Sequence, residues 1–134
     1  MNPILRKKLE ILVYLALSDK EFADKERDFI NNICDRNHID PSVVEEILEE
    51  PMDIGSLGAL SYDKSVEYLT DCLMLMLVDG KVLPGEILFC EDIAIRLGFP
   101  KKSTDELISH VSRQKGISRK RVVEQIQELP HMMK

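Results

Sequence analysis

The stretch "LMLVDGKVLPGEILFCEDIAIRLGF", residues 75 to 99, decides the fold because it repeats an earlier part of the same chain. Moved back by 60 residues, it aligns without a gap with "LALSDKEFADKERDFINNICDRNHI", residues 15 to 39. Apolar positions match almost throughout, so the sequence predicts an internal duplication. Identical residues on this register are Leu15/Leu75, Leu17/Leu77, Asp19/Asp79, Glu26/Glu86, Phe29/Phe89, Ile33/Ile93, Arg36/Arg96 and, further on, Glu46/Glu106.

Each copy predicts three helices. The first is apolar nearly all round, as in "LEILVYLAL" and "CLMLMLV", which is typical of a helix in the middle of a bundle. The second carries apolar residues at i, i+1, i+4 and i+5, a single stripe on a charged helix. The third is short. It is expected to begin at Asp40-Pro41 in the first copy, and at "STDE" in the second, where Ser103 and Glu106 predict a capping box.

The expected fold class is all-α: one compact bundle of about seven helices, built from two repeated three-helix units and a C-terminal helix. A chain of 134 residues is one ordinary domain, and neither half buries its apolar helix alone. Gly116 is expected to close a helix and Ser118 to cap the last one. Within 1–134, repeat one covers about 3–50, a linker covers 51–60, repeat two covers about 61–115, and a basic helix covers 117–130.

Charge divides the chain. The net charge is −6, but residues 1 to 100 carry 10 basic and 20 acidic side chains, whereas residues 101 to 134 carry 8 basic and 4 acidic ones. An acidic body repels nucleic acid, so we expect no nucleic-acid partner.

The longest apolar run, Cys72 to Val78, is far shorter than the ~20 residues that span a bilayer. With no signal peptide at the N-terminus, the sequence predicts a cytoplasmic protein.

The basic segment "SRQKGISRKR", residues 112 to 121, has two interpretations. The simpler one is a solvated helix end. In the other, it is an electrostatic contact for an acidic protein, for an anionic lipid surface in peripheral contact, or for the acidic body of a second copy in a homodimer.

Asp79-Gly80 and Glu86 mark the junction between two predicted helices. Gly80 supplies the left-handed backbone that ends the first helix. Glu86 follows Pro84 in the first turn of the next helix, where a carboxylate meets free backbone N–H groups. Helix termination by Gly80 and helix capping by Glu86 account for the junction residues without any ligand.

A metal site is the alternative interpretation. If the repeat carries a pseudo-twofold axis, Asp19, Glu26, Asp79 and Glu86 converge, and four carboxylates suit Ca²⁺ or Mg²⁺. The site is not an EF-hand, because the twelfth position counted from each Asp is Ile30 or Cys90, and neither serves as a bidentate ligand.

The sequence contains no catalytic constellation. Cys34, Cys72 and Cys90 align with apolar residues of the other copy, so we expect buried free thiols rather than disulfides or zinc ligands. The three histidines lack metal-ligand spacing, and no Ser-His-Asp arrangement is evident.

The duplicated pattern of an apolar helix, an Asp, six intervening residues, a Glu and an amphipathic helix resembles the tellurite-resistance TerB-like family. The resemblance covers roughly residues 5 to 112 and leaves the basic segment outside. It implies an all-helical bundle with no established catalytic activity, linked to tellurite and stress resistance. Such domains also occur at the N-terminus of a membrane-bound DnaJ-type co-chaperone. The family pattern has Gly and a capping Ser or Thr where this chain has Lys20 and Leu83.

The resemblance also implies that the duplicated acidic residues are metal ligands, which here are Asp19, Glu26, Asp79 and Glu86.

Our main expectation is a non-enzymatic module that binds another protein, in a stress or tellurite-resistance response. The alternative is a divalent-cation sensor that uses the four acidic residues. A small hydrolase or transferase has no supporting residues. The surfaces expected to contact a partner are the basic segment and an acidic face that carries Glu45, Glu46, Glu49 and Glu50.

Overall fold

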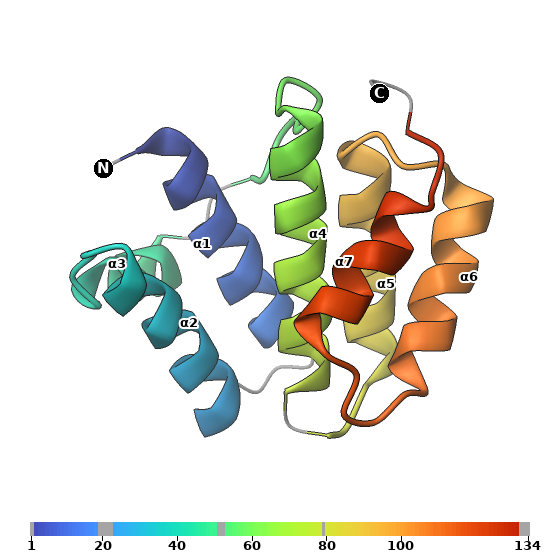
Figure 1. The fold of residues 1–134 in the computed structure, drawn as a ribbon. Helices are drawn as coiled ribbons and strands as arrows, with labels where there is room; N and C mark the ends of the chain where they lie inside the picture. The colour runs from blue at the N-terminus through green and yellow to red at the C-terminus, as the bar shows by residue number, and fades with distance from the viewer. Residues whose placement is uncertain (1, 19–22, 51–52, 79, 132–134) are drawn as a thin grey trace.

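The computed structural model describes residues 2–18, 23–50, 53–78 and 80–131, and within these ranges the regular structure is helical (Figure 1). The expected all-α bundle is confirmed. The helices are α1 (Pro3–Leu17), α2 (Asp24–Arg36), α3 (Ser42–Glu49), α4 (Tyr62–Leu77), α5 (Pro84–Arg96), α6 (Lys101–Ser112) and α7 (Arg119–Gln127).

The helices repeat along the chain as the sequence predicts. We call α1 to α3 unit one and α4 to α6 unit two. α2 and α5 begin and end 60 residues apart, and α1 and α3 have counterparts of similar position in α4 and α6. Equivalent side chains of α2 and α5 share the same degree of burial at every position except Lys25 and Gly85. The duplication in the sequence is therefore a duplication of secondary structure and burial.

The apolar helices α1 and α4 form the centre of the bundle. α4 contacts α1, α5, α6 and α7, and it stands between α1 and α7 in Figure 1. α1 contacts α2, α3, α4 and α5. Buried leucine, isoleucine and valine side chains of both helices meet in one core, and burying each such side chain contributes roughly 1.5–3 kcal/mol. None of the described helices combines the length and apolar character needed to cross a membrane.

The C-terminal helix α7 belongs to the bundle. It packs on α4, and its Val122 and Ile126 are fully buried. The helix is shorter than the expected range of 117–130. Ser118 caps it as predicted, because its hydroxyl accepts the Arg121 N–H at 3.1 Å. Among the described residues, no helix equivalent to α7 follows unit one, so the two units differ in the helices that pack on α1 and on α4.

One predicted cap is wrong and another is confirmed. α6 begins at Lys101, directly after the extended Pro100, so Ser103 and Glu106 lie within the helix and form no capping box. The earlier start is favoured because lysine is a good helix former and Lys101 pairs with Asp105 at 2.7 Å. At α3, Asp40 accepts the Ser42 N–H at 2.9 Å, as a capping residue should.

The end of α6 also differs from expectation. The helix stops at Ser112, and Gly116, with a φ of 72°, lies in the connection to α7 rather than at the helix end.

Candidate functional site

Two of the four predicted metal ligands act as helix caps. Glu26 and Glu86 are 1% and 2% exposed, each in the first turn of its helix. Glu26 accepts the Ala23 N–H at 3.1 Å and Glu86 accepts the Leu83 N–H at 2.9 Å. Each carboxylate also lies at the positive end of a helix dipole. The capping role that the sequence predicts for Glu86 is confirmed, and Glu26 repeats it in unit one.

The other two predicted ligands, Asp19 and Asp79, lie outside the described residues. Next to Asp79, Gly80 has a φ of 77° and donates its N–H to Leu77 at 3.2 Å, which confirms the predicted turn. Within the described part of the chain, no three metal-ligating side chains gather at one point. The four-carboxylate metal site stays a prediction.

The cysteines occupy the core positions that the repeat predicts. Cys34, Cys72 and Cys90 are fully buried and free. Burial raises the pKa of all three thiols, because a thiolate loses hydration in the apolar core. A neutral buried thiol is a poor nucleophile, so we assign these residues to packing.

The predicted acidic face is exposed on α3. Two of its four glutamates are already paired, Glu45 with Arg27 at 2.7 Å and Glu46 with Arg6 at 3.3 Å. Such exposed pairs contribute little to stability, so both glutamates can exchange partners with little loss. Glu49 and Glu50 complete the face at the C-terminal end of the helix.

The basic segment forms one wall of an apolar groove of about 660 Å³. Residues 112–117, which include Arg113 and Lys115, line the groove on this side. The apolar lining comes from α2, from the end of α4, and from the connections between α4 and α5 and between α6 and α7. Its residues, all half-buried, are Phe29, Met74, Leu77, Val78, Val82 and Ile117.

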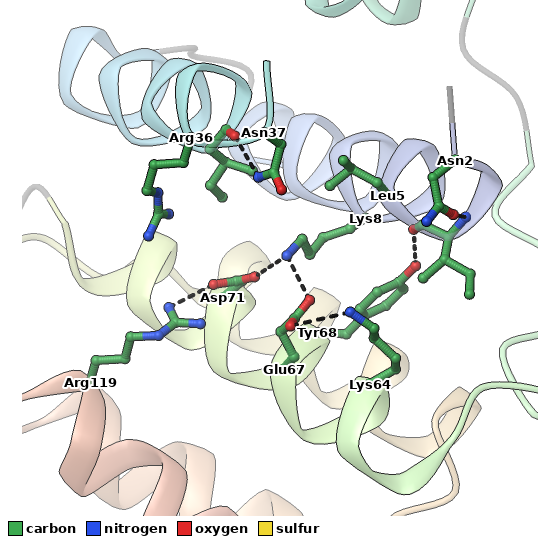
Figure 2. Close-up of a pocket in the computed structure, with 12 residues that line it drawn as sticks. Asn2, Leu5, Lys8, Arg36, Asn37, Lys64, Glu67, Tyr68, Asp71 and Arg119 are labelled. Carbon is green, nitrogen blue, oxygen red and sulfur yellow. Dashed lines mark hydrogen bonds and ion pairs between the residues drawn. The ribbon is translucent and has the colours of Figure 1, made fainter. Parts of the chain in front are cut away.

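A second cavity, of about 330 Å³, is polar and opens between α1, α2, α4 and α7 (Figure 2). We call it the polar pocket. Side chains from all four helices converge on it, including two that are almost completely buried, Lys8 and Asp71. Its charged lining residues are Lys8, Arg36, Lys64, Glu67, Asp71 and Arg119.

Ion pairs connect most of these charges. Lys8 Nζ lies 2.8 Å from Glu67 Oε2 and 3.0 Å from Asp71 Oδ2. Arg119 Nη1 donates to Asp71 Oδ1 at 2.7 Å, and Lys64 Nζ lies 3.5 Å from Glu67 Oε1. A cation therefore faces each oxygen of both carboxylates.

In the polar pocket, the pKa of Glu67 is lowered and the pKa of Tyr68 is raised, so both shifts lead away from neutral pH. Burial opposes the charge of Glu67, but the hydrogen bond and charge of Lys8, with the charge of Lys64, outweigh it and lower the pKa below its usual value. Burial raises the pKa of Tyr68, whose hydroxyl donates to the Ile4 carbonyl. A general acid or base works best with a pKa near the working pH, so neither group is tuned for proton transfer.

Sequence analysis missed the polar pocket, although the repeat carried a signal. Asp71 stands in an apolar helix where the other copy has Ile11, and Lys8 stands where it has Tyr68. A charge at a position that the repeat makes apolar is a candidate for a buried pair. The sequence did not say which cation would meet Asp71, because Lys8 and Arg119 come from distant segments.

Comparisons of this chain with protein-family models, with curated proteins and with solved structures found no match. The TerB-like resemblance therefore rests on the duplicated sequence pattern and stays a proposal.

Proposed function

We propose that the protein is a non-enzymatic TerB-like module that works by binding another protein, in a stress response such as tellurite resistance. The groove beside the basic segment carries the proposal. Six half-buried apolar side chains border one cavity, and a partner that covers them gains the free energy of removing apolar surface from water.

The charge of the groove wall defines the partner. Arg113 and Lys115 are exposed beside the apolar lining. Arg113 donates only to Ser109 Oγ, at 2.9 Å, and makes no ion pair within the described residues. A complementary partner segment has apolar anchors on one side and acidic residues that reach the basic wall. An amphipathic acidic helix has this pattern, and helix-in-groove binding is a common mode of peptide recognition.

Two observations favour binding over catalysis. The groove lining contains the cations Arg113 and Lys115, and none of its described residues is a carboxylate, a histidine or a cysteine. In the polar pocket, the pKa values of Glu67 and Tyr68 are shifted away from the range that general acid–base catalysis uses.

The test is affinity capture with the full chain as bait, using groove variants. We expect a captured protein that is lost both with Ile117→Asp and with the double variant Arg113→Glu/Lys115→Glu. The matched control is Leu88→Asp, which removes an apolar side chain that is 65% exposed on α5 and does not line the groove. A synthetic acidic peptide from the captured protein should then bind the wild type and not Ile117→Asp.

Loss of folding is excluded by the charge-reversal variant, because Arg113 and Lys115 are exposed and their replacement leaves the core intact. If every captured protein is recovered equally with all baits, including a Glu49→Lys/Glu50→Lys variant of the acidic face, the proposed function is wrong.

A further inference from the structure

Two equivalent arginines of the repeat meet different neighbours. In unit two, Arg96 Nε bonds Asp92 at 2.9 Å and its Nη1 bonds the Gly55 carbonyl at 2.9 Å. In unit one the residue equivalent to Asp92 is Asn32, which carries no charge. Arg36 Nε makes only a long bond of 3.4 Å to the Asn32 carbonyl, and Arg36 forms no ion pair within the described residues. The replacement of one carboxylate by an amide leaves Arg36 without the charge partner that Arg96 has.

Arg36 lines the polar pocket. Figure 2 shows its side chain reaching from the end of α2 toward Asp71 and Arg119. The lining contains four cationic side chains and two carboxylates, so the pocket carries an excess of two positive charges. The guanidinium of Arg36 presents several N–H donors in one plane, which suits bidentate binding of an anion.

The two carboxylates of the pocket are not open to a new cation. Asp71, 1% exposed, faces Arg119 through one oxygen and Lys8 through the other, the second contact being an ion pair without hydrogen-bond geometry. Glu67 is held by Lys8 and Lys64. An incoming cation would have to displace one of these partners, whereas an incoming anion meets Arg36 directly. The pocket is therefore organised for an anion.

We propose that the polar pocket binds a small molecule that carries a phosphoryl group, with Arg36 as the principal ligand and Arg119 beside it. A phosphate monoester carries a charge of about −1.5 to −2 at pH 7, which matches the excess positive charge of the lining. The cavity of about 330 Å³ lies at the small end of ligand pockets, which run from roughly 300 to 1,000 Å³. It accommodates a phosphate with a compact organic group and not a large cofactor.

The arrangement also explains why a charged pair is buried here. Replacing a buried ion pair by apolar residues is often neutral or stabilising, so Lys8 and Asp71 are not required for stability as such. Asp71 holds Arg119 at the pocket, and Lys8 holds Glu67 there. We assign these two residues to positioning, while Arg36 contacts the ligand.

The experiment is a calorimetric titration of the full chain with inorganic phosphate, at constant ionic strength maintained with chloride. We expect saturable binding by the wild type and at least tenfold weaker binding by Arg36→Gln. Arg96→Gln is the matched control, because it removes the equivalent arginine of unit two, which lies outside the pocket, and its affinity should stay within twofold of wild type. Melting temperatures in chloride show that both variants are folded.

A second pair of titrations identifies the ligand class. Glycerol 2-phosphate, a small phosphate ester, should bind at least as tightly as inorganic phosphate, and the dicarboxylate succinate at least tenfold more weakly. The proposal is overturned if phosphate shows no saturable binding, if Arg36→Gln and Arg96→Gln lose affinity equally, or if succinate binds as well as the phosphate ester. None of these variants touches the groove, so this result and the capture experiment are independent.

Discussion

The two central helices, α1 of unit one and α4 of unit two, make an instructive comparison. Both are buried along most of their length, and both carry the apolar side chains that join the two units. At one equivalent position, however, α1 has the buried Ile11 and α4 has the buried Asp71. Three residues earlier, α1 has Lys8 and α4 has Tyr68, so at each of these two positions one helix carries a charged residue where the other carries an uncharged one. Lys8, Tyr68 and Asp71 line the polar pocket.

The difference separates architecture from recognition. Features that recur in both units, such as the capping carboxylates Glu26 and Glu86, are explained by the fold alone. Features present in one unit only, such as the buried Asp71 and an Arg36 that forms no ion pair among the described residues, gather at one cavity. A duplication thus supplies its own control, because each position can be compared with an equivalent position in the same chain.

The largest expected effect comes from making the units alike at Asp71. Asp71→Ile should lower the free energy of unfolding by about 3 kcal/mol, because it leaves Lys8 buried with only Glu67 as a counter-charge. Urea denaturation measures the change. The double variant Lys8→Met/Asp71→Ile should recover most of the loss. A single variant as stable as wild type would show that the pair is not buried in the way described.

Removing the capping carboxylates should have a smaller and symmetric effect. Glu26→Ala and Glu86→Ala should each cost about 1–2 kcal/mol, since each loses a charge-assisted bond to a backbone N–H and the interaction with the helix dipole. Chemical denaturation provides the values. Clearly unequal losses would break the comparison between the units.

The same carboxylates test the cation-sensor alternative. If they are caps alone, Ca²⁺ or Mg²⁺ leaves the melting temperature unchanged in both wild type and Asp79→Asn. A concentration-dependent rise seen only in the wild type would instead support a cation site.

The turn that ends α2 offers a stabilising change. His38 has a φ of 56°, and its counterpart in unit two is Gly98, with a φ of 98°. The two turns are alike: the next residue donates its N–H to Cys34 at 2.9 Å in unit one and to Ala94 at 3.0 Å in unit two. Glycine adopts this left-handed conformation without strain, so His38→Gly should raise the free energy of unfolding by about 1 kcal/mol.

The reverse substitution should have the opposite sign. Gly98→Ala should destabilise the protein, because the new Cβ would lie 3.0 Å from His131 Nε2 on a strained backbone. Thermal melts give both signs, and a stabilised Gly98→Ala would contradict the equivalence of the two turns.

The smallest expected effect is the pH dependence contributed by Glu67. Because its pKa in the folded protein lies below the usual value, the stabilisation is fully present above the unfolded pKa and is lost as the pH falls through the folded pKa. Its side chain is 36% exposed, so solvent screens most of the interaction. Urea midpoints at neutral and acidic pH should converge slightly for wild type and Glu67→Gln. A gap that widens below pH 4 would reverse the assigned direction.

The sequence predicted the fold because the duplication states the helix pattern twice. Apolar periodicity and local capping placed the buried faces of α2 and α5, since both depend on residues a few positions apart. It misplaced the start of α6, where a capping motif at Ser103 competed with two lysines that extend the helix. It also missed the polar pocket, because the pairing of Lys8 with Asp71 and of Asp71 with Arg119 joins residues that only the tertiary fold brings together.

The central claim is that differences between the two units, rather than their shared features, form the binding site. The most direct measurement is an NMR titration of isotope-labelled wild type with inorganic phosphate at constant ionic strength. We predict saturable shifts of the backbone amides of Arg36, Asp71 and Arg119, with the amides of the equivalent Arg96 and Ile11 unchanged. Shifts of equal size at Arg36 and Arg96 would contradict the claim, because they would show that phosphate meets both units as a general counter-ion.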